Sequence, residues 1–209
     1  MKYIIFLFLT LSFLDTKSQN IADGFVYLSS VDNTIKSELR YLNSNNFIGK
    51  PINGYHKNCI ITTKETAIAL GKIFDAYRPQ QSVDHFVKWA LDLKDTLKKQ
   101  QFYPDVPKSE LFKRGYIASK SGHTRGSTVD LTIVEIKTKK ELDMGSPYDF
   151  FGIQSHPFYK KISSIQKKNR LYLRKIMLEN GFKPYDNEWW HFTLKKEPFP
   201  KTYFNFPVE

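Results

Sequence analysis

Two separated fragments of the chain carry the residue types of a metal-dependent hydrolytic site. The first runs from His123 to Asp130, and the second runs from Glu188 to His191. Zinc in hydrolases usually takes three protein ligands from His, Asp or Glu and keeps a fourth position open for water. The residues therefore predict His123, Asp130 and His191 as ligands of one zinc ion per chain. Glu188 is the carboxylate left over, and we expect it to act as the base.

The residues around the first fragment suit such a site. Gly126 permits a turn soon after His123, and the segment 128–134, which contains Asp130, is rich in β-branched residues and predicts a strand. A loop ligand and a strand ligand can therefore converge on one ion. Taken alone, a His and an Asp seven residues apart occur in many unrelated proteins, so this fragment is not specific by itself.

The second fragment needs a distorted backbone. Aromatic residues at 189–192 indicate a strand, in which Glu188 and His191 would point to opposite faces because side chains alternate. We therefore expect a kink or bulge that turns both toward one metal ion. The pair differs from a helical His-Glu-x-x-His motif because it offers one histidine. A lone Glu-x-x-His is usually surface chemistry, so the metal site is inferred from the two fragments jointly.

Five runs of the sequence, taken in order, carry a resemblance to a known family. They are Asp75–Pro79, Ser119–Thr132, Asp143–Phe151, Gly181–Phe182 with Glu188–Phe192, and Tyr203–Pro207. In these runs the chain resembles the D-alanyl-D-alanine dipeptidases, zinc peptidases of the vancomycin-resistance type that are related to bacterial D,D-carboxypeptidases. The resemblance extends from about Phe25 to the C-terminus.

The resemblance implies a role for each matching residue. Those that match the zinc ligands are His123, Asp130 and His191. Glu188 matches the general base that takes a proton from the zinc-bound water and passes it to the departing amine. Arg78 matches the residue that stabilises the tetrahedral oxyanion, and Asp149 with Tyr41 matches the positions that receive the α-ammonium of the dipeptide. The implied activity is zinc-dependent hydrolysis of D-alanyl-D-alanine in cell-wall peptide metabolism.

Local sequence supports two of these roles and leaves alternatives open. Pro79 biases Arg78 toward an extended conformation at a strand end, where a permanently charged guanidinium fork suits an oxyanion. A surface or ion-pairing arginine is the ordinary alternative. Asp149 has apolar and aromatic neighbours that suggest burial, and a buried carboxylate needs a partner. A substrate ammonium, a nearby lysine or a backbone amide could each be that partner.

The pattern of elements predicts a single α+β domain. We expect a mainly antiparallel central sheet flanked by helices, with the zinc site on one face of the sheet. Helical patterns occur at 63–70, 83–98 and 163–180, the last followed by an Asn-Gly pair typical of a helix C-terminus. Strands are predicted at 72–77, 128–134, 182–185 and 189–194. Loops at 101–107 and 141–155 are expected to wall the pocket.

The N-terminus resembles a secretory signal. Lys2 precedes an apolar stretch of about twelve residues, which is too short to span a membrane comfortably. We expect residues 1–18 to be a signal peptide and 19–209 the enzyme domain, exported to a periplasm and not inserted in the membrane after cleavage. A buried N-terminal helix is the alternative. The single cysteine, Cys59, excludes an internal disulfide and is expected to be a small buried hydrophobe.

The formal net charge is +11, and loss of residues 1–18 removes two lysines and one aspartate to leave +10. A basic surface attracts anions, but no nucleic-acid motif accompanies the lysine clusters. We expect a solvated surface with loose attraction to an anionic envelope. The predicted partner is a small D,D-dipeptide, with no nucleic acid, and the sequence does not indicate an oligomeric state.

One departure from the family falls before the Tyr-Arg-Pro run. In the family a helix of the 65–70 type continues for several more turns, whereas here only Gly71 separates Leu70 from Lys72. A displaced Arg78 would impair catalysis, so a catalytically impaired family member is one alternative.

Two other functions compete with the dipeptidase. One is a D,D- or L,D-carboxypeptidase that trims peptidoglycan stem peptides, and the other is a silent cell-wall binding module. Asp149 and Tyr41 favour the dipeptidase over the carboxypeptidase, because a clamp for a free ammonium would reject longer peptides. Glu188 argues against the silent module, since such a module has no use for a base beside zinc.

Overall fold

The structure is a computed structural model that describes residues 21–67, 72–135, 137–138 and 140–209. At its centre is a five-stranded sheet in the order β2-β4-β5-β7-β6. Its strands are β2 (Lys36–Ser37), β4 (Lys72–Asp75), β5 (Thr128–Thr132), β6 (Phe182–Tyr185) and β7 (Glu188–Leu194). β2 runs parallel to β4, and all the other neighbouring pairs are antiparallel. The predicted α+β domain with a mainly antiparallel sheet is confirmed.

A small second sheet corrects one helical prediction. β1 (Phe25–Tyr27) pairs antiparallel with β3 (Ile61–Thr63), and a short 3-10 helix at Lys64–Thr66 follows. The segment 63–70 was predicted to be helical, but its described part begins at a strand end. The three buried β-branched residues of β3 favour pairing with β1 over a helix. The expected shortened helix and the departure at Gly71 lie largely at 68–71, outside the described residues.

Two longer helices and one short one complete the fold. α3 (Ser164–Glu179) matches its prediction closely, because Ser163 and Gln166 form a capping box at its start. α1 (Gln80–Leu91) begins three residues before the predicted start and ends seven residues before the predicted end. It stops at Asp92, whose carboxylate accepts a hydrogen bond from the backbone N–H of Lys94 in a local turn. α2 (Lys99–Phe102) is a separate turn of helix.

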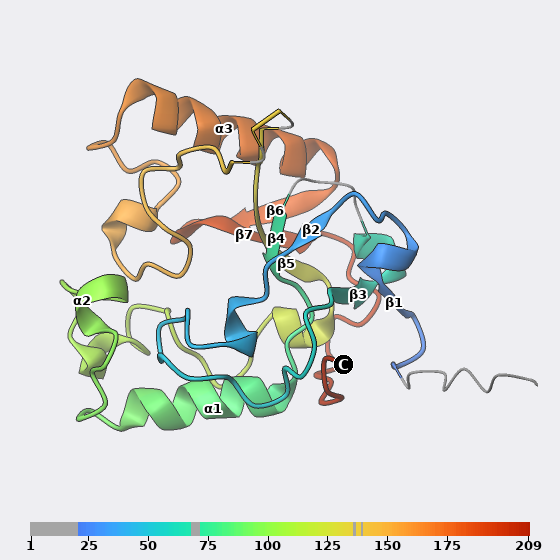
Figure 1. Cartoon of the computed structure of the whole chain (residues 1–209), viewed down its shortest axis with the longest axis horizontal. Helices are drawn as coiled ribbons and strands as arrows, with labels where there is room; N and C mark the ends of the chain where they lie inside the picture. Colours follow the sequence, from blue (N-terminus) through green and yellow to red (C-terminus); the bar gives the residue numbers. More distant parts are fainter. Residues whose placement is uncertain (1–20, 68–71, 136, 139) are drawn as a thin grey trace, which may run out of the picture.

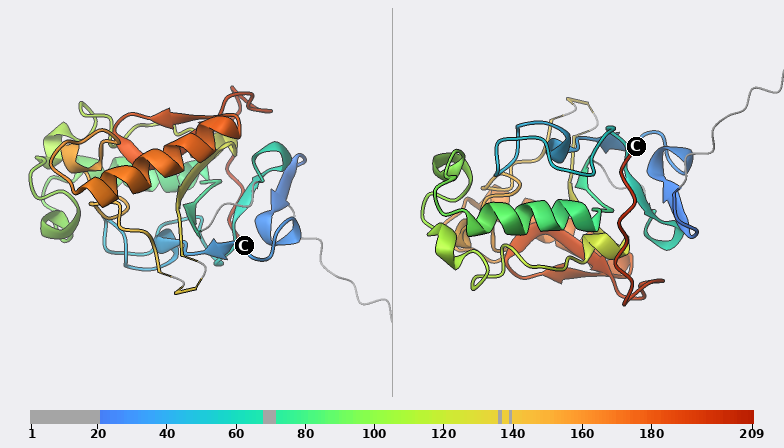
Figure 2. Two further views of the ribbon diagram at one scale, coloured as in Figure 1. Left: turned by 90° about the horizontal axis from the view of Figure 1, so that it is seen from above. Right: turned by 90° about the horizontal axis from the view of Figure 1, so that it is seen from below.

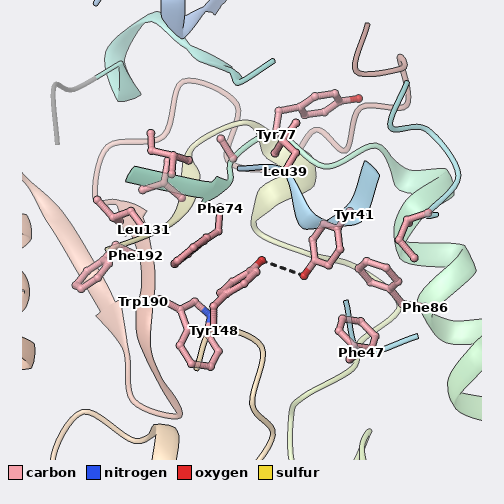
Figure 3. Packing of buried hydrophobic residues seen from close by; sticks show 14 of the residues in the cluster. Leu39, Tyr41, Phe47, Phe74, Tyr77, Phe86, Leu131, Tyr148, Trp190 and Phe192 are labelled. Carbon is pink, nitrogen blue, oxygen red and sulfur yellow. Dashed lines mark hydrogen bonds between the residues drawn. The ribbon is translucent and has the colours of Figure 1, made fainter. Parts of the chain in front are cut away.

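The helices lie on opposite sides of the sheet. α3 covers one side and packs against β6 and β7, while α1 runs across the other side of the molecule (Figures 1 and 2). An aromatic core fills the space between α1 and the sheet, where Phe86 of α1 packs against Tyr41, and Tyr41 in turn lies beside Tyr148 (Figure 3). Within the described part of the chain, no helix is both long and apolar enough to span a membrane.

The C-terminal run braces two segments that carry candidate site residues. Phe206 stacks on Tyr77 with ring centroids 4.1 Å apart. The carbonyl of Phe204 accepts a hydrogen bond from the N–H of Gln80, and the N–H of Phe204 donates to the carbonyl of Thr124. The last residues of the chain therefore hold the segments 77–80 and 123–125 beside each other.

Candidate metal centre and substrate pocket

Strand register places three polar side chains in one row. Asp130 of β5 lies directly opposite His191 of β7 and also opposite Asp75 of β4. Directly opposed residues of antiparallel strands project from the same face of the sheet. Asp75, Asp130 and His191 therefore face the same side of the sheet, as was expected for Asp130 and His191.

His123 reaches this row from a tight turn. It begins a short 3-10 helix, His123–Arg125, that ends at Gly126 with φ of +81°. A Cβ atom at Gly126 would lie 2.2 Å from the ring of Phe25, so the turn requires glycine for both its conformation and its contact. The chain then enters β5, which explains how a loop histidine and a strand aspartate converge.

The imidazoles and the carboxylate meet as a metal site would require. One donor atom each from His123, Asp130 and His191 lies within 4.8 Å of the others. His123 Nε2 is 3.2 Å from Asp130 Oδ2, and His191 Nδ1 is 3.0 Å from Asp130 Oδ1. Despite that proximity, the buried Oδ1 forms no well-directed hydrogen bond. A buried carboxylate oxygen without a hydrogen-bond partner, close to two imidazole nitrogens, offers the donor types of a zinc site, so the three residues fit a metal ion.

The surroundings prepare these ligands for a cation. His123 Nδ1 donates a hydrogen bond to the carbonyl of Ala76 at 2.7 Å, which leaves the lone pair of Nε2 directed at the site. Burial alone would raise the pKa of Asp130, but the adjacent His123 and His191 hold that pKa well below its ordinary range. The carboxylate is therefore ionised, as a metal ligand must be.

Glu188 reaches the site through the expected bulge. The pairing of β6 with β7 jumps from Pro184–Phe192 to Tyr185–Glu188, so residues 189–191 have no counterparts on β6. This irregularity brings Glu188 Oε2 to 3.4 Å from His191 Nδ1. Burial raises the pKa of Glu188 to about 7, against the opposing effect of His191. A carboxyl with that pKa can both accept and return a proton near neutral pH.

Arg78 lies between the metal ligands and Tyr41. Its Nη2 is 3.6 Å from Asp130 Oδ2 and 3.5 Å from the hydroxyl of Tyr41. Asp75 holds it through a hydrogen bond from Nε at 2.9 Å and an ion pair with Nη2 at 2.8 Å. Although burial opposes the charge, Tyr41 and Asp75 raise the pKa of Arg78 well above its ordinary value. The guanidinium is therefore a fixed cation at the edge of the candidate metal site.

Asp149 is the second buried carboxylate of the pocket. Its Oδ1 accepts a hydrogen bond from the hydroxyl of Tyr41 at 3.1 Å, whereas its buried Oδ2 has no hydrogen-bond partner. Burial, and then the charge of Asp130, raise the pKa of Asp149 well above the ordinary carboxyl value. Its φ of +63° is a left-handed conformation that aspartate tolerates better than most residues. The free oxygen would gain most from a cationic partner.

All seven predicted site residues line one cavity of about 190 Å³, smaller than the roughly 300–1,000 Å³ typical of drug-sized ligands. Residues 115–118 and 120–122 form much of its wall, together with Phe86 of α1. Asp149 and Phe151 confirm that the loop 141–155 contributes to the wall. The loop 101–107 does not, which corrects that prediction: the carbonyl of Phe102 accepts a hydrogen bond from the N–H of Phe151, so this loop supports the wall from behind.

Two residues of the site were not singled out from the sequence. Asp75 belongs to the same short run as Arg78. The only signal for its role was that it precedes Arg78 by three residues. Tyr148 precedes Asp149, and its hydroxyl can donate to Tyr41 at 3.1 Å (Figure 3) or to Asp130 at 3.3 Å. No residue pattern marks such a tyrosine as anything other than core.

The site has the residue types of a hydrolase, with a candidate metal centre in a small pocket, and comparison with known proteins agrees. Residues 21–209 match the family described as D-ala-D-ala dipeptidase, Peptidase M15. The chain is 41% identical to a D-alanyl-D-alanine dipeptidase of Enterococcus faecalis over 89% of this chain and 98% of that protein. Dipeptidases of the same name from Enterococcus faecium and Streptomyces coelicolor are 38% and 39% identical, over 89% and 88% of this chain and 98% of each protein.

The chain therefore belongs to the D-Ala-D-Ala dipeptidase family of Peptidase M15, a family of metal-dependent hydrolases. Its candidate metal ligands are the three residues whose donor atoms converge in the structure.

Proposed function

We propose that this protein is a zinc dipeptidase that hydrolyses D-alanyl-D-alanine and thereby acts in cell-wall peptide metabolism. The relatives named above carry this activity in their names. The observation that carries the proposal is the pairing, in one small cavity, of the convergent metal ligands with a buried carboxylate, Asp149, whose Oδ2 has no hydrogen-bond partner. A metal centre alone would fit many hydrolases, whereas a buried carboxylate beside it selects a short substrate with a free ammonium.

His123, Asp130 and His191 would hold the zinc ion. A zinc ion bound there would supply Lewis acidity, which polarises a carbonyl group and lowers the pKa of water to about 7. Glu188 takes the proton from the attacking water and delivers it to the departing amine, which its pKa of about 7 allows near neutral pH. Arg78 stabilises the negative charge that develops on the carbonyl oxygen, because its guanidinium is already fixed by Asp75.

The other end of the pocket selects the substrate. Oδ2 of Asp149 accepts a hydrogen bond from the substrate ammonium, while Tyr41 keeps Oδ1 in place. A peptide with residues before its last two has an amide at this point and no charge to compensate for desolvating the carboxylate. The pocket therefore disfavours stem peptides, which distinguishes the dipeptidase from a carboxypeptidase of the same fold.

Steady-state assays of the purified protein with zinc test the activity. D-Ala-D-Ala should be cleaved, and the N-acetylated dipeptide and a stem peptide that ends in D-Ala-D-Ala should be cleaved on the order of 100-fold more slowly, the cost of an unpaired buried charge. L-Ala-L-Ala serves as the control for contaminating peptidases. Equal or faster cleavage of the stem peptide would make the protein a carboxypeptidase.

Metal analysis tests the site independently of activity. The purified protein should hold about one zinc ion per chain, and His123→Ala should lose it because two ligands cannot replace three. Arg125→Ala is a suitable control, since Arg125 follows His123 closely but bonds Glu197 and Tyr203. Full metal retention in His123→Ala would remove this histidine from the site.

We also propose that residues 1–18 direct export, with the enzyme acting in the periplasm. The short apolar stretch behind Lys2 supports this proposal, although it lies outside the described residues. N-terminal sequencing of the protein from the periplasmic fraction should find Gln19 or a neighbouring residue as the first. A protein that keeps Met1 and stays in the cytoplasm would contradict it.

A further inference from the structure

A buried arginine behind the pocket has no part in the proposed chemistry. Arg170 of α3 is 1% exposed, and its guanidinium lies against the loop 144–156, which carries Asp149. Nε donates to the carbonyl of Met144 at one end of this loop, and Nη1 donates to the carbonyl of His156 at the other end, at 2.7 Å. Nη2 donates to the carbonyl of Gln154 at 2.8 Å. One side chain therefore closes the loop at both ends.

This cation makes no ion pair with any carboxylate in the described part of the chain. Its acceptors are neutral oxygens, although the charge of Asp143 acts on it from a distance and partly offsets the effect of burial. Burying a charge without a countercharge costs stability, so stability alone gives no reason for an arginine at this position. Its fork of donors instead fits several carbonyls at fixed angles, which an apolar side chain cannot do.

The contacts of Arg170 continue to the backbone beside Asp149. Its Nη2 also donates to the hydroxyl of Ser146 at 3.3 Å, and that hydroxyl lies 3.1 Å from the hydroxyl of Ser155. Ser155 in turn donates to the carbonyl of Phe150 at 2.6 Å. Phe150 follows Asp149 directly, so the chain of hydrogen bonds ends at the carbonyl of the residue after the left-handed one.

We propose that Arg170 is a positioning residue for substrate selection: it holds the loop 144–156 so that Asp149 keeps the orientation in which Oδ2 meets the substrate ammonium. The inference rests on the proposed function, because it assigns that ammonium to Asp149. Groups that recognise a substrate must be held within a fraction of an ångström, and a loop achieves this only when other residues fix it. β5 and β7 need no such anchor for the metal ligands.

The proposal predicts a particular kinetic signature. The ammonium keeps its charge from the bound dipeptide to the transition state. A misplaced Asp149 therefore weakens binding of the dipeptide and binding of the transition state equally. Such a change raises KM and leaves kcat nearly unaltered. A general loss of folded protein would instead lower the apparent kcat and leave KM unchanged.

Arg170→Lys is the main variant, because it keeps the charge and loses the fork. We expect its KM for D-Ala-D-Ala to rise about tenfold, as for loss of a hydrogen bond to a charged group, with kcat within about threefold of the wild type. Its preference for the free dipeptide over the N-acetylated one should fall by the same factor, and its zinc content should stay at the wild-type level. Ser155→Ala, a milder change that removes the last bond of the chain, should move KM and preference in the same direction by about threefold.

Leu173→Ala is the matched control. Leu173 lies on α3 one turn from Arg170 and is buried in the core. Its replacement by alanine removes packing, but its side chain makes no hydrogen bond to the loop 144–156. It should lower the melting temperature and leave KM and substrate preference unchanged. If Leu173→Ala shifts KM as much as Arg170→Lys does, the proposal is wrong. It is also wrong if neither Arg170→Lys nor Ser155→Ala shifts KM.

Hydrogen exchange gives a readout that does not depend on activity. Amides of residues 146–155 should exchange about tenfold faster in Arg170→Lys than in the wild type, and should be unaffected in Leu173→Ala. Unchanged exchange in a folded Arg170→Lys would overturn the anchoring role. Failure of the proposed function is a separate outcome, since it would show as a wild-type enzyme that does not cleave D-Ala-D-Ala.

Discussion

Asp130 and Asp149 are both buried carboxylates of the pocket, but their surroundings differ. Asp130 lies in the middle of a paired strand, with His123 and His191 beside it, and its pKa is well below the ordinary range. Asp149 lies in a loop in the left-handed conformation, one of its oxygens has no partner, and its pKa is raised. The negative charge at the metal end is compensated by the protein, whereas at the other end compensation is left to the substrate.

The two ends also differ in how their side chains are held. Backbone pairing sets the register of Asp130 and His191, so few side-chain contacts are needed to place them. Asp149 depends on hydrogen bonds from side chains to the carbonyls of its loop. Changes to the strand-held end should therefore reduce turnover, and changes to the loop-held end should alter selection between substrates.

Replacement of the base should have the largest effect and should be confined to turnover. In Glu188→Gln the amide can neither accept nor return the proton, so kcat should fall about 1,000-fold or more. Zinc content should not change, because Glu188 is not among the three convergent ligands. Parallel measurements of kcat and bound zinc check this. If zinc is lost together with activity, Glu188 is a ligand and the assignment of the metal end is wrong.

Arg78→Lys should have the next largest effect. Lysine keeps the positive charge but cannot bond Asp75 with two nitrogens while it faces the developing oxyanion. Loss of such a donor typically lowers kcat by about 100-fold or more. Free and N-acetylated dipeptide should be affected alike, because the scissile carbonyl is the same in both. A defect limited to the free dipeptide would place Arg78 with the ammonium end instead.

Asp149→Asn should reverse that pattern. The ammonium loses its countercharge, so kcat/KM for D-Ala-D-Ala should fall on the order of 100-fold, while the N-acetylated dipeptide should be affected far less. Comparison of the two substrates on wild type and variant provides the measurement. Similar losses on both substrates would remove Asp149 from ammonium recognition.

The same residue predicts a pH dependence. Because burial raises the pKa of Asp149, the carboxylate needed to bind the ammonium is lost as pH falls, already above the ordinary carboxyl range of about 4. KM for the free dipeptide should therefore rise toward acid pH in the wild type. In Asp149→Asn this dependence should be absent, and a rise that persists there would have to come from another group.

Sequence reasoning did well where a local pattern determines the structure. The β-branched run around Asp130 became β5, the helical pattern at 163–180 that ends before an Asn-Gly pair became α3, and the three-residue spacing of Glu188 and His191 did require a bulge. Each of these follows from the alternation of a strand or the cap of a helix.

Sequence reasoning failed where partners distant in the chain decide the outcome. The segment 61–63 pairs with β1, more than thirty residues earlier, and local propensity does not reveal such a partner. Tyr148 looks like an ordinary core aromatic, because its contacts with Tyr41 and Asp130 depend on how β5 and two loops come together. The anchoring of the loop 144–156 by Arg170 of α3 was not predictable for the same reason.

Tyr148 offers the smallest and most discriminating test, because it touches both ends of the pocket. Its hydroxyl can donate to Asp130 at one end or to Tyr41, the partner of Asp149, at the other end. Tyr148→Phe should keep the ring packed on Phe74, 4.5 Å away, and lose one hydrogen bond. Since such a bond contributes about 1 kcal/mol, kcat/KM should fall only about fivefold.

Whether that small effect appears in KM or in kcat shows which end of the pocket the Tyr148 hydroxyl serves. If the hydroxyl serves Tyr41, the effect should appear in KM and should shrink when Asp149→Asn is already present, with a coupling of about 0.5 kcal/mol or more. If it serves Asp130, the effect should appear in kcat and should add to that of Asp149→Asn. We expect the first result, because Asp130 already has two imidazoles and Arg78 beside it, whereas Tyr41 must itself donate to Asp149. Strict additivity in a double-mutant cycle would contradict this expectation and assign Tyr148 to the metal end.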